Sequence, residues 1–201
     1  INNLSSKTAF TGAPDLPDGF GDTTGNQTQL AFFEGFKNIA AIRDEIRQSV
    51  LDFARVAQLV ESDPDLSALA GPYGRLVPRF DRTRVAYLGE SFGTLVGADL
   101  AAIEPRISLY VLDVPGGGVI DDILPNSAYI ASLALPIVQQ IYRSRGTIDR
   151  FHPLTAALQA VFDAGDPLSF APHVLHDRLR IDNAQLGPRH VVAIEAVTDE
   201  I

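Results

Sequence analysis

A serine lies between two glycines at a spacing that is typical of nucleophilic catalysis. Residues 89–93 read Gly-Glu-Ser-Phe-Gly, so one residue separates Ser91 from Gly89 and one separates it from Gly93. At a sharp turn from strand to helix, such a serine lifts its hydroxyl above the sheet, and the glycines let the backbone pass without a Cβ clash. The backbone N–H of Phe92 is then expected to be one donor to an oxyanion. The pattern alone also occurs by chance in glycine-bearing loops, so its meaning depends on the flanking elements.

The flanking residues predict the strand and the helix that this turn requires. Residues 85–88 form a short apolar run that is rich in strand-forming residues. Residues 94–103 carry leucine, valine, alanine and isoleucine, and Pro105 ends the apolar helix that they predict. Strand, tight turn and helix together favour a nucleophilic serine over a chance match.

Two aspartates follow later strands and are candidates for the acid of a catalytic triad. Residues 107–112 and 191–197 are apolar runs that predict two further strands, and Asp113 and Asp199 follow them. A strand, a crossover helix and another strand imply parallel pairing, and ligands bind at the carboxyl ends of parallel strands. Both aspartates are therefore expected at the edge of the sheet that carries Ser91. The chain order serine, acid, histidine favours Asp199, and Asp113 is the alternative.

The histidines of the chain do not supply an obvious catalytic base. They stand at positions 152, 173, 176 and 190, all before Asp199. His190 begins its strand, which is the wrong end of the sheet. His173 and His176 could turn inward, although surface or capping roles are commoner. We therefore expect polypeptide outside these 201 residues to supply the histidine, a second oxyanion donor and further strands. The chain resembles a fragment of a larger domain, and alone it is expected to be insoluble or molten and inactive.

The composition excludes several other classes of function. A formal net charge of −9 argues against nucleic acid as a partner, because phosphate binding needs clustered lysine and arginine. The chain has no cysteine, which excludes thiolate catalysis, disulfides and cysteine-based metal sites. The histidine spacing matches no common metal motif, so no metal and no cofactor are expected. The glycines at 116–118 lack a following Gly-Lys-Ser/Thr, which disfavours a phosphate site. No apolar run reaches the roughly 18 residues of a transmembrane helix.

The rest of the chain predicts a core interrupted by one long insertion. Residues 1–29 have turn chemistry throughout and predict a loop. Residues 30–61 place apolar side chains at helical spacing, which predicts an amphipathic helix that covers a sheet. The core is assigned to residues 1–113 and 183–201, and the insertion to 114–182.

The insertion is predicted to form a cap or lid. Its helices are expected at 128–142, where Pro136 should kink or restart the helix, and at 154–164. Residues 166–168 and 171–173 predict turns. The apolar circumference of the first helix fits a lid over an apolar substrate cleft, and an ordinary core helix is an equally good interpretation.

Several segments resemble bacterial α/β-hydrolases of the extracellular lipase/esterase type. The pentapeptide at 89–93 is shared by many hydrolases, whereas the Arg-Asp-x-x-Arg-Gln pattern that starts at Arg43 is more particular. The other similar segments are 21–25, 38–52, 113–118, 165–173 and 190–201. Together they cover most of the chain. In that family a His-Gly oxyanion loop precedes these segments and the catalytic histidine follows the acid.

The resemblance implies a fold, an activity and a location. The expected fold is the α/β-hydrolase fold, with a parallel sheet, helices on both faces and a helical cap. The expected activity is hydrolysis of carboxylic esters or lipids through an acyl-enzyme on Ser91, with Asp199 orienting the histidine and without a cofactor. An extracellular or cell-envelope location is expected. The alternative is a catalytically incomplete hydrolase-like domain that binds an apolar ligand or partner.

Overall fold

The computed structural model describes residues 35–67, 79–181 and 184–195 of the chain. The chain divides into two compact units. Of the described residues, 35–45 and 117–164 belong to unit 1, and 46–67, 79–116, 165–181 and 184–195 belong to unit 2. The predicted loop at 1–29 lies outside the described residues.

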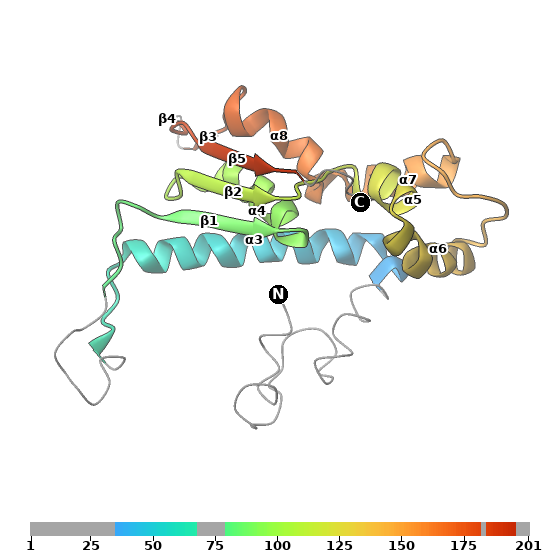
Figure 1. Cartoon of the computed structure of the whole chain (residues 1–201), viewed down its shortest axis with the longest axis horizontal. Coiled ribbons are helices and arrows are strands. Elements are labelled where there is room, and N and C mark those ends of the chain that lie inside the picture. Colours follow the sequence, from blue (N-terminus) through green and yellow to red (C-terminus); the bar gives the residue numbers. More distant parts are fainter. Residues whose placement is uncertain (1–34, 68–78, 182–183, 196–201) are drawn as a thin grey trace. The chain divides into compact units, whose positions relative to one another are not determined.

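Unit 2 is built on an open parallel sheet of three strands (Figure 1). The strands are β1 (Ala86–Glu90), β2 (Leu109–Asp113) and β5 (His190–Ile194), in the order β1-β2-β5. Both pairings are parallel, which confirms the prediction of a mixed α/β architecture with parallel strands. Strand β1 extends two residues beyond the predicted run, because Gly89 and Glu90 continue the pairing with β2.

Helix α4 (Phe92–Ile103) follows β1 and packs on one face of this sheet. Val96 and Leu100 are fully buried, and the hydroxyl of Tyr110 on β2 lies 3.4 Å from the Leu100 carbonyl oxygen, to which it donates a hydrogen bond. Tyr87 of β1 lies on the same face and is also buried. The predicted helix at 94–103 is confirmed and begins two residues earlier.

Helix α8 (Pro167–Leu175) packs against α4 within unit 2. The turns predicted at 166–168 and 171–173 are wrong, because both lie at or within this helix. Asp166 caps it by accepting the Leu168 N–H at 2.9 Å. Pro167 occupies the first turn, where a missing N–H costs little, and the helix continues through Pro172.

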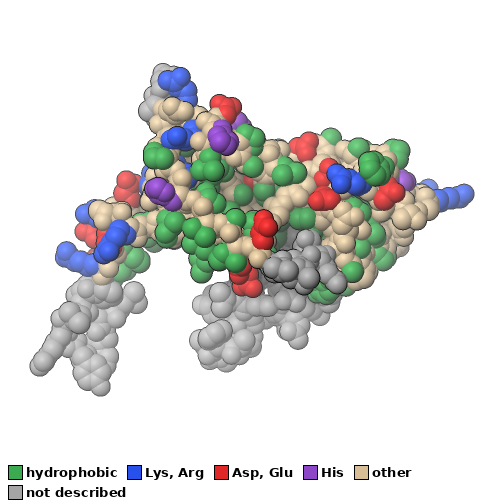
Figure 2. Space-filling model, turned by 45° about the horizontal axis from the view of Figure 1, so that its top comes forward, with side chains coloured by type: hydrophobic (Ala, Val, Ile, Leu, Met, Phe, Trp, Pro, Cys, Tyr) green, Lys and Arg blue, Asp and Glu red, His purple; other side chains and the backbone are tan. Residues whose placement is uncertain are grey.

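The opposite face of the sheet is uncovered by the described residues. Leu88 in β1 is 74% exposed, and the side chains of Leu109, Val192 and Ile194 on the same face are also exposed. The expectation of helices on both faces is therefore not met in the described part of the chain. Two successive right-handed crossovers that move in one direction, from β1 to β2 and from β2 to β5, place their helices on the same face. Figure 2 shows hydrophobic side chains at the surface of the part that carries the sheet.

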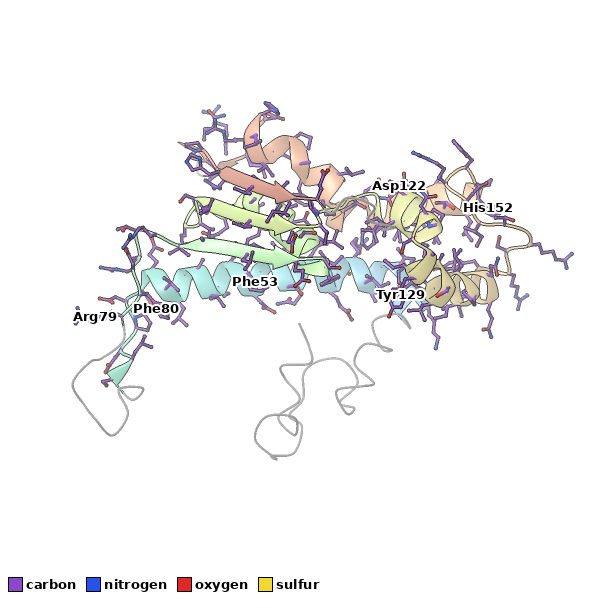
Figure 3. All side chains as sticks on the ribbon, in the orientation of Figure 1. Phe53, Arg79, Phe80, Asp122, Tyr129 and His152 are labelled. Carbon is purple, nitrogen blue, oxygen red and sulfur yellow. The ribbon has the colours of Figure 1, made fainter. Side chains whose placement is uncertain are left out.

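Helix α3 (Ile39–Glu61) confirms the long amphipathic helix. It follows a short 3-10 turn, η2 (Gly35–Lys37), and the first predicted residues, 30–34, lie outside the described residues. Its later turns belong to unit 2 and carry Phe53, which is labelled in Figure 3. The Phe53 ring meets the Tyr87 ring edge-on at a centroid distance of 5.3 Å.

A buried arginine joins the start of β5 to the end of α4. Arg189 is 6% exposed and donates hydrogen bonds to the carbonyl oxygens of Ala101 (3.2 Å), Glu104 (2.9 Å) and Gly187 (2.8 Å). A guanidinium at this place satisfies carbonyls that have no partner within the helix and complements the negative end of the helix dipole. A small antiparallel hairpin, β3 (Arg180–Ile181) and β4 (Ala184–Gln185), precedes it in the chain.

The described part of unit 1 is helical. It contains η4 (Val119–Ile123), α5 (Leu124–Asn126), α6 (Ala128–Tyr142) and α7 (Pro153–Phe162), followed by the short η5 (Asp163–Gly165). Helix α6 has the predicted bounds and runs through Pro136, and α7 confirms the second predicted helix of the insertion. Ile120, Val138 and Phe162 are fully buried in this unit.

Candidate active site

Ser91 stands between β1 and α4 in an unusual backbone conformation. Its φ is 48° and its ψ is −115°, and it is the N-cap residue of α4. A residue with a side chain at such angles carries a cost of about 1–3 kcal/mol and persists only where its surroundings enforce it. The side chain is solvent-exposed. The sharp turn that the sequence predicts from strand to helix is therefore present, with the hydroxyl on the solvent side.

Two glycines allow α4 to lie close to β1. A Cβ at Gly89 would stand 2.5 Å from the Gly93 carbonyl oxygen, and a Cβ at Gly97 would stand 2.5 Å from the Tyr87 ring. At Gly93 a Cβ would meet only the Tyr87 hydroxyl, at 3.8 Å. The predicted steric role thus holds for Gly89 but not for Gly93, and Gly97 takes that role instead. The turn at 89–93, from here on the elbow, is followed by small residues at helical spacing, and this spacing is the sequence signal that could have identified Gly97.

Four hydrogen bonds hold the backbone of the turn. The Ser91 N–H donates to the Asp113 carbonyl oxygen at 3.1 Å. Thr94 donates twice to the Ser91 carbonyl oxygen, from its N–H at 2.8 Å and from its hydroxyl at 2.6 Å. The Tyr87 hydroxyl donates to the Gly93 carbonyl oxygen at 2.7 Å, and burial raises the pKa of Tyr87 to about 12, so this donor keeps its proton at neutral pH. The sequence did not single out Tyr87 or Thr94.

Asp113 ends β2 beside the turn. It pairs in register with Glu90 of β1 and with Ile194 of β5. The next residue, Val114, has a φ of 53° and donates its N–H to the Ile194 carbonyl oxygen at 2.7 Å. The carboxyl ends of the three strands thus meet beside Ser91, as expected for a parallel sheet. Asp199 lies outside the described residues, so its role as the acid stays a prediction.

No histidine in the described part of the chain is hydrogen-bonded to the Ser91 hydroxyl. His190 pairs in register with Leu109, at the amino end of the sheet. His173 lies on α8, and its Nδ1 is 2.6 Å from the Asp177 carbonyl oxygen. His190 therefore lies at the opposite end of the sheet from Ser91, and the His173 ring contacts the backbone just beyond its own helix.

A serine–histidine contact occurs in unit 1, away from Ser91, but the histidine is the hydrogen-bond donor, which is the wrong direction for a catalytic base. The Ser144 hydroxyl lies 3.3 Å from His152 Nε2, and His152 Nδ1 accepts the Leu154 N–H at 3.1 Å. Because Nδ1 is the acceptor, the proton of the neutral ring stays on Nε2, which donates to Ser144. His152 in this state caps α7 and cannot take a proton from the Ser144 hydroxyl.

A carboxyl group is buried on α4 without a partner. Asp99 is 2% exposed, and neither of its side-chain oxygens has a hydrogen-bond partner among the described residues. Burial, and secondarily the charge of the fully buried Asp166, raise the pKa of Asp99 to about 8. The protonated, neutral carboxyl is therefore the main form at neutral pH.

The described residues were compared with three other kinds of site: a metal cluster, a membrane-spanning helix and a surface groove. Within them, no group of three or more histidine, aspartate or glutamate side chains could hold a metal ion. In the same part of the chain, no helix has the length and apolar character needed to cross a bilayer. A groove of about 430 Å³ lies along α3, but its lining contains no residue of the elbow. The lining residues are Gln48, Leu51, Asp52, Ala54, Arg55, Gln58 and Arg106.

Comparisons with known proteins found no match: no family model, no curated protein and no solved structure is similar to this chain. The chemistry must therefore be argued from the turn itself. An exposed hydroxyl at the start of α4, beside the carboxyl ends of parallel strands, is placed to attack an electrophilic carbon.

Proposed function

We propose that this chain carries the nucleophile of a serine carboxylic-ester hydrolase of the lipase/esterase type, with an α/β-hydrolase fold. The observation that carries the proposal is the backbone of Ser91, with φ 48° and ψ −115° between a parallel strand and a helix. Backbone strain of this kind is found most often at functional sites. The close approach at Gly89 and Gly97 supports the same geometry. An extracellular or cell-envelope location remains part of the proposal.

The proposed mechanism is acyl transfer through Ser91. Its hydroxyl oxygen attacks the acyl carbon, and a histidine takes the proton and later gives it to the leaving alcohol. The Phe92 N–H and a second donor stabilise the oxyanion of the tetrahedral intermediate. Asp199 orients the histidine, with Asp113 as the alternative acid. Water then hydrolyses the acyl-enzyme and releases the acid, and no cofactor takes part.

We propose that further polypeptide, continuous with this chain or bound to it, supplies the histidine and the second donor. The sheet face that the described residues leave uncovered supports this, because parallel sheets are almost always buried on both faces. Leu88, at 74% exposure, lies on that face. Within the described residues β1 and β5 are also the edges of the sheet, and unpaired strand edges invite additional strands.

A second candidate is a hydrolase-like domain that binds an apolar ligand or partner without catalysis. It is favoured by one observation, that no histidine in the described ranges is hydrogen-bonded to Ser91. The two candidates differ in their response to loss of the hydroxyl, since only catalysis requires it.

The experiment compares ester turnover by the natural protein with that of Ser91→Ala and Ser144→Ala. The second variant is a matched control, because Ser144 also contacts a histidine but with the wrong polarity. We expect Ser91→Ala to lower kcat by several orders of magnitude, about the loss seen for a triad member, and Ser144→Ala to leave it unchanged. Near-native turnover by Ser91→Ala would refute Ser91 as the nucleophile, and a natural protein that turns over no ester would favour the binding domain.

A further inference from the structure

The peptide group that joins Ser91 to Phe92 is held by one side chain. The carbonyl oxygen of Ser91 and the N–H of Phe92 belong to the same planar unit, so fixing one end fixes the direction of the other. The Ser91 oxygen accepts the Thr94 N–H at 2.8 Å and the Thr94 hydroxyl at 2.6 Å. Thr94 is 1% exposed, so water does not compete for either hydrogen bond.

The hydrogen bond from the Thr94 hydroxyl to the Ser91 carbonyl oxygen is not required to form the first turn of α4. The Thr94 N–H already satisfies the Ser91 carbonyl as an ordinary bond of the first turn of α4. A second, shorter bond to the same oxygen restricts rotation of the peptide plane. It also polarises the peptide and strengthens the N–H at its other end as a donor. On the other side of the turn, the Tyr87 hydroxyl restrains the Gly93 carbonyl at 2.7 Å.

We infer that the Thr94 hydroxyl is a positioning residue that aims the Phe92 N–H at the oxyanion. This inference rests on the proposed function, in which that N–H is an oxyanion donor. Thr94 touches no reacting atom and acts through the Ser91–Phe92 peptide. Its contribution therefore belongs to the transition state, where the oxyanion forms, and not to substrate binding.

The test uses Thr94→Val, which removes the hydroxyl at nearly constant shape, and Thr94→Ser, which keeps it. Thr155→Val is the matched control, because Thr155 is also 1% exposed and donates its hydroxyl to a backbone carbonyl, that of Asp149, at 2.8 Å. In well-studied hydrolases, complete loss of an oxyanion donor costs about 100- to 1,000-fold in kcat, so misdirection of one by Thr94→Val in the natural protein should cost about 10- to 100-fold. KM should change by less than about twofold, and Thr94→Ser and Thr155→Val should keep native kcat.

A readout that does not depend on activity completes the test. The amide proton of Phe92 should move upfield in the NMR spectrum of Thr94→Val and return in Thr94→Ser. An unmoved Phe92 amide, or native kcat in Thr94→Val, would overturn the role of Thr94. If the natural protein turns over no ester while the amide still moves, the proposed function fails but the positioning of the peptide stands.

Discussion

Replacement of Asp99 by asparagine should stabilise the protein at alkaline pH and leave it nearly unchanged at acid pH. Asp99 is 2% exposed, both of its carboxyl oxygens are without partners in the described part of the chain, and its pKa is raised from 3.8 to about 8. The folded state therefore holds this proton more tightly than the unfolded chain. The resulting stability is fully present below about pH 4 and is lost as the pH rises through about 8.

The magnitude follows from the size of that shift. Each pKa unit corresponds to about 1.4 kcal/mol, so a shift of about four units lowers the free energy of unfolding by up to roughly 6 kcal/mol between pH 4 and pH 8. This is a large share of the about 5–15 kcal/mol that stabilises a typical domain. Asparagine resembles the neutral carboxyl in size and cannot ionise, so this pH-dependent loss should be absent from Asp99→Asn.

The assay is urea unfolding of the natural protein and of Asp99→Asn at intervals from pH 5 to pH 9. The difference between the two free energies of unfolding should grow with pH and level off above about pH 8. Asp166→Asn keeps the side-chain oxygen that caps α8 but removes a charge that raises the pKa of Asp99. In this variant the loss should still begin near pH 4, where the unfolded chain titrates, and should level off at a lower pH than in the native protein, so the total loss is smaller. A constant difference between Asp99→Asn and the native protein across this pH range would refute the reasoning.

Three further predictions concern the elbow and its support. Gly97→Ala should destabilise the fold by about 1–3 kcal/mol, because the new methyl group would overlap the Tyr87 ring; an unchanged urea midpoint would contradict the close approach. Arg189→Met should lower the free energy of unfolding by about 2–4 kcal/mol in the same assay, since it leaves the last carbonyls of α4 unpaired. An unchanged free energy of unfolding would contradict this and mean that water replaces the guanidinium. Asp199→Asn should cripple ester turnover by about 10⁴-fold, as loss of the orienting acid does in other triads, while Asp113→Asn should cost much less; the reverse ranking of kcat would move the acid to Asp113.

The core elements could be predicted from the sequence because their signals are local. Apolar runs at 85–88 and 107–112 become β1 and β2 with shifts of one to two residues, and helix α6 has its predicted bounds. Helix α8 could not be predicted in this way, because Pro167 and Pro172 are ordinary turn signals. Tertiary packing on α4 and the Asp166 cap outweigh those local preferences.

The site was only partly predictable for a related reason. The spacing of Gly89, Ser91 and Gly93 locates the turn, but it does not tell which glycine is sterically required. That depends on where the Tyr87 ring lies, which is set by packing between β1 and α4. The role of Thr94 could not be predicted either, because threonine is common in the first turn of a helix. Its role depends on its hydrogen bond to the Ser91–Phe92 peptide, which only the structure shows.

The central claim, a nucleophilic serine at the turn between β1 and α4, is tested most directly by mapping a fluorophosphonate adduct on the natural protein. Peptide mass spectrometry after labelling should find one adduct, on Ser91, that is absent from Ser91→Ala and retained in Ser144→Ala. A protein that takes up no label, or that carries it on a serine other than Ser91, would contradict the claim.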